Sequence, residues 1–198
     1  MSEIQAPVIG HSSGLTAGDQ QGSLGIAVLG NRRHTNAQPT MKYLPVGLDV
    51  RGRICIVVGA GNVGARKVTN LLGAGAAVTV VSPDAPPDIA RLAAEGHLIW
   101  KKRSFQAQDL EEAFLVVAAT DDQEVNAELV HLSADQGALV CDASSADRSE
   151  VIFGAIHQTA GTTVAVFTDG RSPSRARRTR DRIASLQREW EEEQEETE

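Results

Sequence analysis

Three glycines with the spacing G-x-G-x-x-G form the clearest chemical motif of this chain: Gly59, Gly61 and Gly64. At the first position glycine permits a tight turn, at the second it lets the backbone approach a pyrophosphate, and at the third it lets a helix pack closely on its strand. The apolar run Ile54–Val58 precedes the motif and helix-forming residues follow it over 65–72. A buried strand, a glycine turn and a helix whose first amides face phosphates are typical of dinucleotide binding. The alternative is a glycine-rich turn that binds nothing.

A second candidate binding position follows the next apolar run, Ala77–Val81, where the sequence continues Ser82-Pro83-Asp84. In nucleotide-binding folds an acid about 20 residues beyond the glycines accepts hydrogen bonds from the ribose hydroxyls. Asp84 is the only acid nearby and no arginine adjoins it, so the sequence favours NAD over NADP. Alternatively, Ser82 and Asp84 cap a helix that starts near Pro86.

Polar residues also follow the apolar run 114–119, in the order Thr120-Asp121-Asp122. The carboxyl ends of parallel strands border the ligand crevice of such folds. We therefore expect Thr120 and Asp121 to contact the nicotinamide ribose or the substrate. The alternative is that Asp121 or Asp122 caps the helix expected over 124–136.

The elements that would position these residues alternate between strand and helix. The expected strands are 54–58, 77–81, 98–100, 114–119 and 138–141, and the expected helices are 62–72, 88–95 and 124–136, with a short helical turn at 109–113. This alternation predicts an α/β fold, a Rossmann-like, doubly wound parallel sheet.

The pattern changes after Asp142. Val151–Phe153 and Thr163–Phe167 read as two strands without a helix between them. Two strands alone are not a stable sheet in water, so they should either pair with a second copy or dock on the first domain. We expect the former, which makes a homodimer. A helix should then start at Ser172-Pro173 as N-cap and first residue. Its apolar positions are Ala176, Thr179, Ile183, Leu186 and Trp190.

These boundaries predict four regions. They are a disordered leader over 1–40, an NAD-binding domain over 41–148, a small dimerisation module over 149–170, and a charged helix with an acidic tail over 171–198. The last helix begins with several arginines, whose guanidinium groups can bind carboxylates or phosphates in a bidentate manner. A solvated face partly neutralised by the glutamate run is the alternative.

Composition excludes several classes of protein. The formal charge of −7 is carried by the end of the chain from Glu189 to Glu198, so nothing favours nucleic acid as a partner. No apolar run is long enough to cross a bilayer. The two cysteines, Cys55 and Cys141, lie in predicted interior strands, which fits a reducing, cytoplasmic setting without disulfides. No histidine has a recognisable ligand spacing, and we predict no metal site.

From Met41 to Ile183 the chain resembles the NAD-binding precorrin-2 dehydrogenase family, the module at the N-terminus of siroheme synthases. The motifs that carry this resemblance are Tyr43-Leu44-Pro45, Val57 to Lys67, Ala118 to Asp122, Ile152-Phe153 and Gly170-Arg171-Ser172-Pro173. The resemblance implies oxidation of precorrin-2 to sirohydrochlorin with NAD, in siroheme biosynthesis. It also implies that Asn62, Val63, Pro83 and Asp84 hold the dinucleotide.

The chain departs from the family at an acidic position. The family has Asn-x-x-Asp after its fifth strand, where Cys141 and Ser144 stand here when counted without gaps. Serine does not replace a carboxylate as base or metal ligand at neutral pH. We therefore expect Asp142 to take the catalytic role beside Ser144, and no iron chelation. Arg171 and Arg175 are the expected ligands of the anionic tetrapyrrole.

The same departure supports a second hypothesis. A catalytically degenerate paralogue would bind NAD or a tetrapyrrole as a carrier, sensor or partner protein. The intact glycine turn and the Thr120-Asp121-Asp122 segment favour the enzyme.

Overall fold

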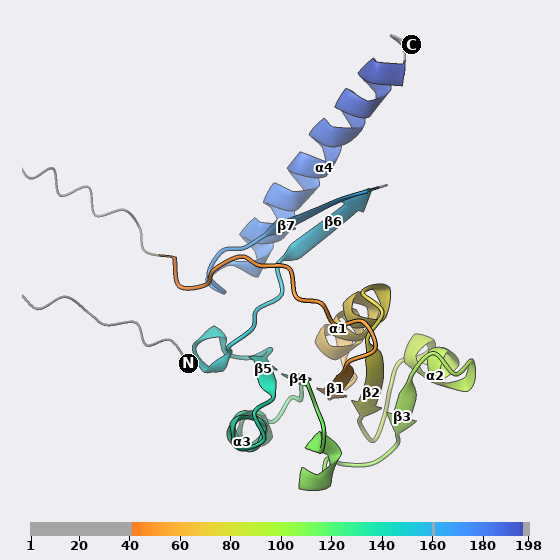
Figure 1. The fold of residues 1–198 in the computed structure, drawn as a ribbon, viewed down its shortest axis with the longest axis vertical. Helices are drawn as coiled ribbons and strands as arrows, with labels where there is room; N and C mark the ends of the chain where they lie inside the picture. The colour runs from red at the N-terminus through yellow and green to blue at the C-terminus, as the bar shows by residue number, and fades with distance from the viewer. Residues whose placement is uncertain (1–40, 160, 196–198) are drawn as a thin grey trace, which may run out of the picture. The chain divides into compact units, whose positions relative to one another are not determined.

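A computed structural model describes residues 41–159 and 161–195 of the chain (Figure 1). The predicted leader over 1–40 and the last three residues of the acidic tail lie outside these residues.

Five parallel strands form one sheet with the order β3-β2-β1-β4-β5. Their bounds are Ile54–Val58 for β1, Ala77–Val81 for β2, Ile99–Lys101 for β3, Leu115–Ala118 for β4 and Leu139–Asp142 for β5. The strand β1 lies at the centre, where Val57 pairs with Val80 of β2 and Val117 of β4. All three side chains are fully buried, as expected for a parallel sheet covered on both faces. The predicted doubly wound sheet is confirmed.

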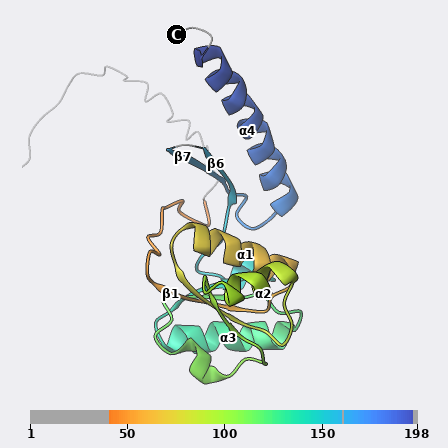
Figure 2. The ribbon, with the colours of Figure 1, turned by 90° about the vertical axis from the view of Figure 1, so that its right-hand side faces the viewer.

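Helices cover both faces of this sheet (Figure 2). The helices α1, Asn62–Gly73, and α2, Pro87–Ala94, pack on the face that contains Cys55 and Val57. The helix α3, Gln123–Asp135, and the 3-10 turn η1, Ala107–Leu110, pack on the face that contains Ile56 and Val58. Alternate residues of β1 thus enter two separate apolar cores, because successive side chains of a strand point to opposite faces. Chain order reverses between β1 and β4, which places a crevice at their carboxyl ends.

The small sheet differs from its prediction. It consists of β6, Ala155–Thr159, and β7, Thr162–Val166, which pair antiparallel. Val151–Phe153 is not a strand, so that part of the prediction was wrong. Val151 and Phe153 pack against the core under α1 and α2, and this burial explains the apolar run that resembled a strand. A second correction is that β5 extends to Asp142 instead of ending at Cys141.

The last helix, α4, runs from Pro173 to Glu195 beside the β6–β7 hairpin (Figure 1). Over 173–190, where burial is described, the buried residues of α4 are Ala176 and Ala184. The predicted apolar face was therefore only partly right, because Leu186 is 49% exposed and Trp190 is 62% exposed. Among the residues that the structure describes, no helix is long and apolar enough to cross a membrane.

Candidate functional site

Two of the motif glycines are required by the packing of the protein itself. Gly59 has a φ of 94°, and a Cβ there would collide with the carbonyl group of Ala119, the residue after β4. A Cβ at Gly64 would collide with the carbonyl oxygen of Gly59. The turn after β1 can therefore close against β4 only without side chains at these two positions.

Gly61 is different, because no protein atom lies within 4 Å of where its Cβ would be. Its φ of −62° is open to any residue. Gly61 is the N-cap of α1, and no side chain caps this helix end. The first amides of α1 are thus without a side-chain acceptor and face open space, which is the arrangement that binds phosphates. The geometry fits the dinucleotide that the sequence predicts.

A crevice of about 740 Å³ opens beside this turn, within the usual range of about 300–1,000 Å³ for small-molecule sites. Predicted residues that line it are Gly59, Gly61, Asn62, Pro83, Asp84, Thr120 and Asp121. They come from the ends of β1, β2 and β4, which meet at one edge of the sheet. Val63 and Gly64 do not line the crevice: Val63 is 42% exposed and Gly64 lies buried beneath the turn.

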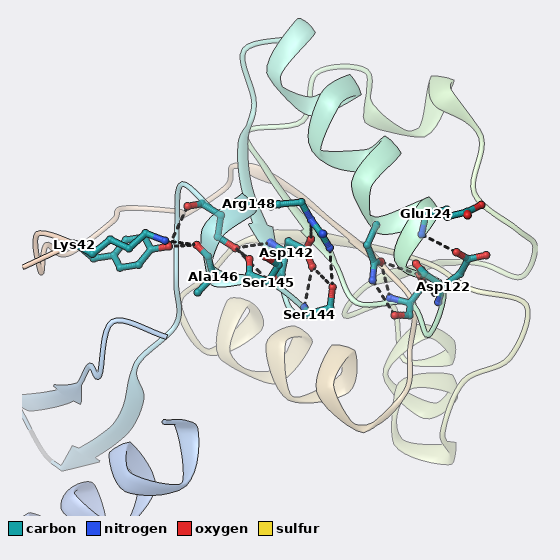
Figure 3. A network of polar contacts seen from close by, with 12 residues as sticks. Lys42, Asp122, Glu124, Asp142, Ser144, Ser145, Ala146 and Arg148 are labelled. Carbon is teal, nitrogen blue, oxygen red and sulfur yellow. Dashed lines mark hydrogen bonds and ion pairs between the residues drawn. The ribbon is translucent and has the colours of Figure 1, made fainter. Parts of the chain in front are cut away.

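Buried hydrogen bonds fix the Thr120 turn. The Asn126 side chain is fully buried, accepts from the Thr120 amide at 3.1 Å and donates to the Thr120 carbonyl at 3.0 Å. Asp122 is the N-cap of α3, because its carboxylate accepts from the amides of Glu124 and Val125 (Figure 3). The capping role thus belongs to Asp122, while Asp121 lines the crevice.

Asp84 does not cap a helix either. The N-cap of α2 is Pro86, without a side-chain hydrogen bond. The Ser82 hydroxyl donates to the Asp84 carbonyl at 2.7 Å and so shapes the turn after β2. The exposed Asp84 carboxylate at the crevice is therefore available to a ribose.

Sequence reasoning missed one wall of the crevice, the segment Ser104–Ala107 after β3. Asp109, whose side chain is 1% exposed, holds this segment. Its carboxylate accepts from Lys101 at 2.8 Å, from Arg103 at 2.6 and 2.7 Å and from the Gln106 amide at 2.9 Å. The Arg103 guanidinium beside Asp109 holds the pKa of that carboxyl well below its usual range, despite burial. The only sequence signal was the spacing of Gln106 and Asp109, which form a capping box.

Asp142 lies buried at the end of β5, where it pairs with Ala118, and is not among the residues that line the crevice. Its carboxylate accepts from the Ser144 amide at 2.8 Å, the Ser144 hydroxyl at 2.6 Å and Arg148 Nε at 2.7 Å (Figure 3). Burial raises the pKa of Asp142, but these hydrogen bonds outweigh it and leave the pKa below its ordinary value. Ser144 itself is exposed.

The turn that contains this network is also held from the start of the described chain. The Tyr43 hydroxyl donates to the carbonyl oxygen of Ala146, and Lys42 pairs with Asp147. Figure 3 shows Lys42 reaching the turn from the opposite side to Arg148.

The remaining predicted residues lie elsewhere. Arg171 and Arg175 are exposed and line neither this crevice nor the second cavity of the fold. Their role in substrate binding stays a prediction. Within the described residues, no three His, Cys, Asp or Glu side chains are grouped to hold a metal ion.

Comparison with known proteins identifies relatives of this chain. Residues 46–155 match a family model described as "Putative NAD(P)-binding". The chain is 38% identical over 146 residues to the siroheme synthase of Nitrosococcus oceani, a match that covers 74% of this chain and 31% of that protein. It is 41% identical over 143 residues to the siroheme synthase of Methylococcus capsulatus, covering 72% and 30%. The chain thus spans about 31% of the length of the first of these relatives.

A solved structure is also similar to this chain. It is SirC, precorrin-2 dehydrogenase, with a TM-score of 0.64 and 35% sequence identity. The match covers 73% of this chain and 71% of that one.

Proposed function

This chain belongs to the NAD(P)-binding family whose model covers residues 46–155, and from this premise we propose that it oxidises precorrin-2 to sirohydrochlorin with NAD, in siroheme biosynthesis. The observation that carries the proposal is the open cradle at Gly61, beside a crevice that Asp84, Thr120 and Asp121 line. The similarity to SirC, precorrin-2 dehydrogenase, supports the choice of substrate.

The chain's own residues would mainly bind and align the two reactants. The first amides of α1 would hold the pyrophosphate, and Asp84 would accept from the ribose hydroxyls, where a 2′-phosphate would be repelled. When bound, NAD supplies the acceptor of a hydride. Alignment in a fixed geometry contributes several kcal/mol, up to about 7–11, to lowering a barrier.

Oxidation also releases a proton, for which we propose a relay through Ser144 to Asp142. The exposed Ser144 hydroxyl donates to Asp142 Oδ1 at 2.6 Å. This hydroxyl can take the substrate's proton while its own passes to the carboxylate. Because the pKa of Asp142 is lowered by its partners, the carboxylate is a weak base, and we expect slow turnover. Because Ser144 stands where the family has an aspartate, and a serine hydroxyl is not a metal ligand at neutral pH, we propose no chelatase activity.

A binding protein without catalysis is the second candidate function. The observation that favours it is that the Asp142 carboxylate already accepts three hydrogen bonds from Ser144 and Arg148. Such a paralogue would bind NAD or a tetrapyrrole as a carrier, sensor or partner protein.

Two further parts of the proposal concern assembly and location. We propose a homodimer through the β6–β7 hairpin, where Ile156 is 37% exposed. We also propose a cytoplasmic location, which the two buried free thiols of Cys55 and Cys141 support. Burial raises the pKa of Cys55 to about 11, so this thiol is unreactive at neutral pH.

An anaerobic assay of the full chain tests the proposal. Precorrin-2 and NAD are supplied, and NADH is followed together with the tetrapyrrole spectrum. We expect both signals to rise together in the wild type and in Gly73→Ala, and to be strongly reduced in Gly61→Ala. NAD binding without turnover would establish the binding protein instead.

A further inference from the structure

A second cavity, of about 180 Å³, lies between α1 and the small module. Residues from both sides line it, among them Arg66, Lys67, Ile152, Phe153, Arg177 and Arg180. Arg66 and Lys67 come from α1, the next two from the connection after β5, and the last two from α4. The cavity shares no lining residue with the dinucleotide crevice.

The charge of this cavity has one sign. Four of its lining residues are Arg or Lys, and none is Asp or Glu. Arg180 is partly engaged, since it pairs with Asp181 at 2.6 Å and donates to the Ile156 carbonyl at 2.9 Å. Within the described residues, Arg66 and Arg177 form no ion pair. The site therefore offers cations that no carboxylate of its own neutralises.

Lys67 is the buried cation of this cavity. It is only 8% exposed, and its Nζ lies 4.0 Å from the centre of the Phe153 ring. Its ammonium group has no hydrogen bond or ion pair to another described residue, and burial lowers its pKa. Burial also raises the pKa of the nearby Cys141 thiol, so this thiol is neutral and gives no counter-charge. A buried ammonium group is costly without an anion.

The size of the cavity limits the anion. At about 30 Å³ per water it holds roughly six waters, which suits a carboxylate arm and not a whole macrocycle. Its position links it to the crevice, because Arg66 follows Asn62 by four residues on α1. At about 1.5 Å per residue this is roughly 6 Å along the helix. One large ligand could thus reach both places.

We propose that this cavity binds a carboxylate side chain of the tetrapyrrole, with Lys67 as the central cation and Arg66 and Arg177 at its entrance. The inference rests on the proposed function and adds the residues that recognise the substrate's acidic arms. Lys67 is thereby a substrate-binding residue. Its aliphatic stem stays packed in the fold while its charge meets the arm.

The test measures binding, independent of turnover. Sirohydrochlorin is titrated anaerobically into the full chain with its absorbance as readout, and NAD affinity is measured separately. Lys67→Met keeps the stem and removes the charge, and Lys102→Met is the matched control, because Lys102 is exposed and lies outside the cavity. We expect Lys67→Met to weaken sirohydrochlorin binding about tenfold to a hundredfold, the range of one charge-assisted hydrogen bond. NAD affinity should be unchanged in both variants.

A second arm uses the methyl ester of the tetrapyrrole, which lacks the negative charges. The wild type should prefer the free acid, and Lys67→Met should lose most of that preference. Equal binding of sirohydrochlorin by Lys67→Met and wild type would overturn the inference while leaving the proposed function intact. Equal loss of NAD and tetrapyrrole affinity would also overturn it, because the role of Lys67 would then be structural.

Two other outcomes separate the remaining explanations. In one outcome, succinate stabilises the wild type but not Lys67→Met, while both proteins bind sirohydrochlorin equally well. That result would assign the cavity to a free carboxylate and overturn the inference. Failure of the wild type to bind sirohydrochlorin at all would overturn both this inference and the proposed function.

Discussion

Replacing Gly61 by alanine should separate cofactor binding from folding. No protein atom lies within 4 Å of the new Cβ, and the backbone φ of −62° suits alanine. Loss of glycine at an N-cap costs a few tenths of a kcal/mol to about 1 kcal/mol. The lower entropy of the unfolded chain returns about 0.4–1 kcal/mol. We therefore expect the free energy of unfolding to change by less than about 1 kcal/mol.

The effect on NAD should be much larger. The added methyl group occupies the space through which a pyrophosphate would approach the first amides of α1. Losing one hydrogen bond to a charged group costs about 1.5–3 kcal/mol. This corresponds to roughly a tenfold to hundredfold weaker affinity. Isothermal titration of NAD gives the affinity, and urea unfolding gives the stability.

Two glycines of the same helix serve as controls. Gly73→Ala changes a position with no atom within 4 Å at the far end of α1, so it should keep NAD affinity. Gly64→Ala should destabilise the fold, because its Cβ would collide with the Gly59 carbonyl. If Gly61→Ala binds NAD as tightly as the wild type, the pyrophosphate does not pass Gly61. If it destabilises the protein as much as Gly64→Ala, its effect is on folding and not on cofactor binding.

Three further predictions concern carboxylates. Asp142→Asn should lower the free energy of unfolding at neutral pH by about 1–3 kcal/mol, because Arg148 loses its charged partner. Since the folded pKa of Asp142 lies below its ordinary value, the stability that its carboxylate contributes is complete above pH about 4 and is lost as the pH falls through the folded pKa. Urea unfolding of both proteins from pH 7 to 3 measures this pH dependence, and a stability difference that stays constant with pH would contradict the prediction. Asp84→Ser should raise NADP affinity relative to NAD in titrations, whereas an unchanged ratio would remove Asp84 from the ribose site. Asp109→Asn should lower stability by about 1–3 kcal/mol and weaken NAD binding, because Arg103 and the crevice wall lose their anchor; unchanged NAD affinity would show that the wall does not depend on it.

The sheet and its crevice could be predicted because their signals are local. The strand β1, the glycine turn and the Thr120 turn depend on residues adjacent in sequence, and all lie where the pattern placed them. The failures are non-local. Val151–Phe153 is apolar because it packs on the core, which the sequence does not distinguish from a strand. Likewise, nothing in the sequence brings Lys67 over the Phe153 ring, because 86 positions separate them along the chain.

The role of Ser104–Ala107 as a crevice wall was not predicted, because it too depends on non-local contacts. Its position depends on the buried pairing of Asp109 with Lys101 and Arg103, and charged residues usually lie at the surface. The apolar face of α4 was misjudged because the face with small residues packs on the hairpin, while Trp190 is exposed.

We propose that the crevice couples oxidation of the tetrapyrrole to reduction of NAD. The most direct measurement is the stoichiometry of a single anaerobic turnover, with the protein in excess over precorrin-2. We expect one NADH for each sirohydrochlorin formed, and no sirohydrochlorin when NAD is omitted. Sirohydrochlorin formed without NADH, or no reaction of a protein that binds both ligands, would contradict the account.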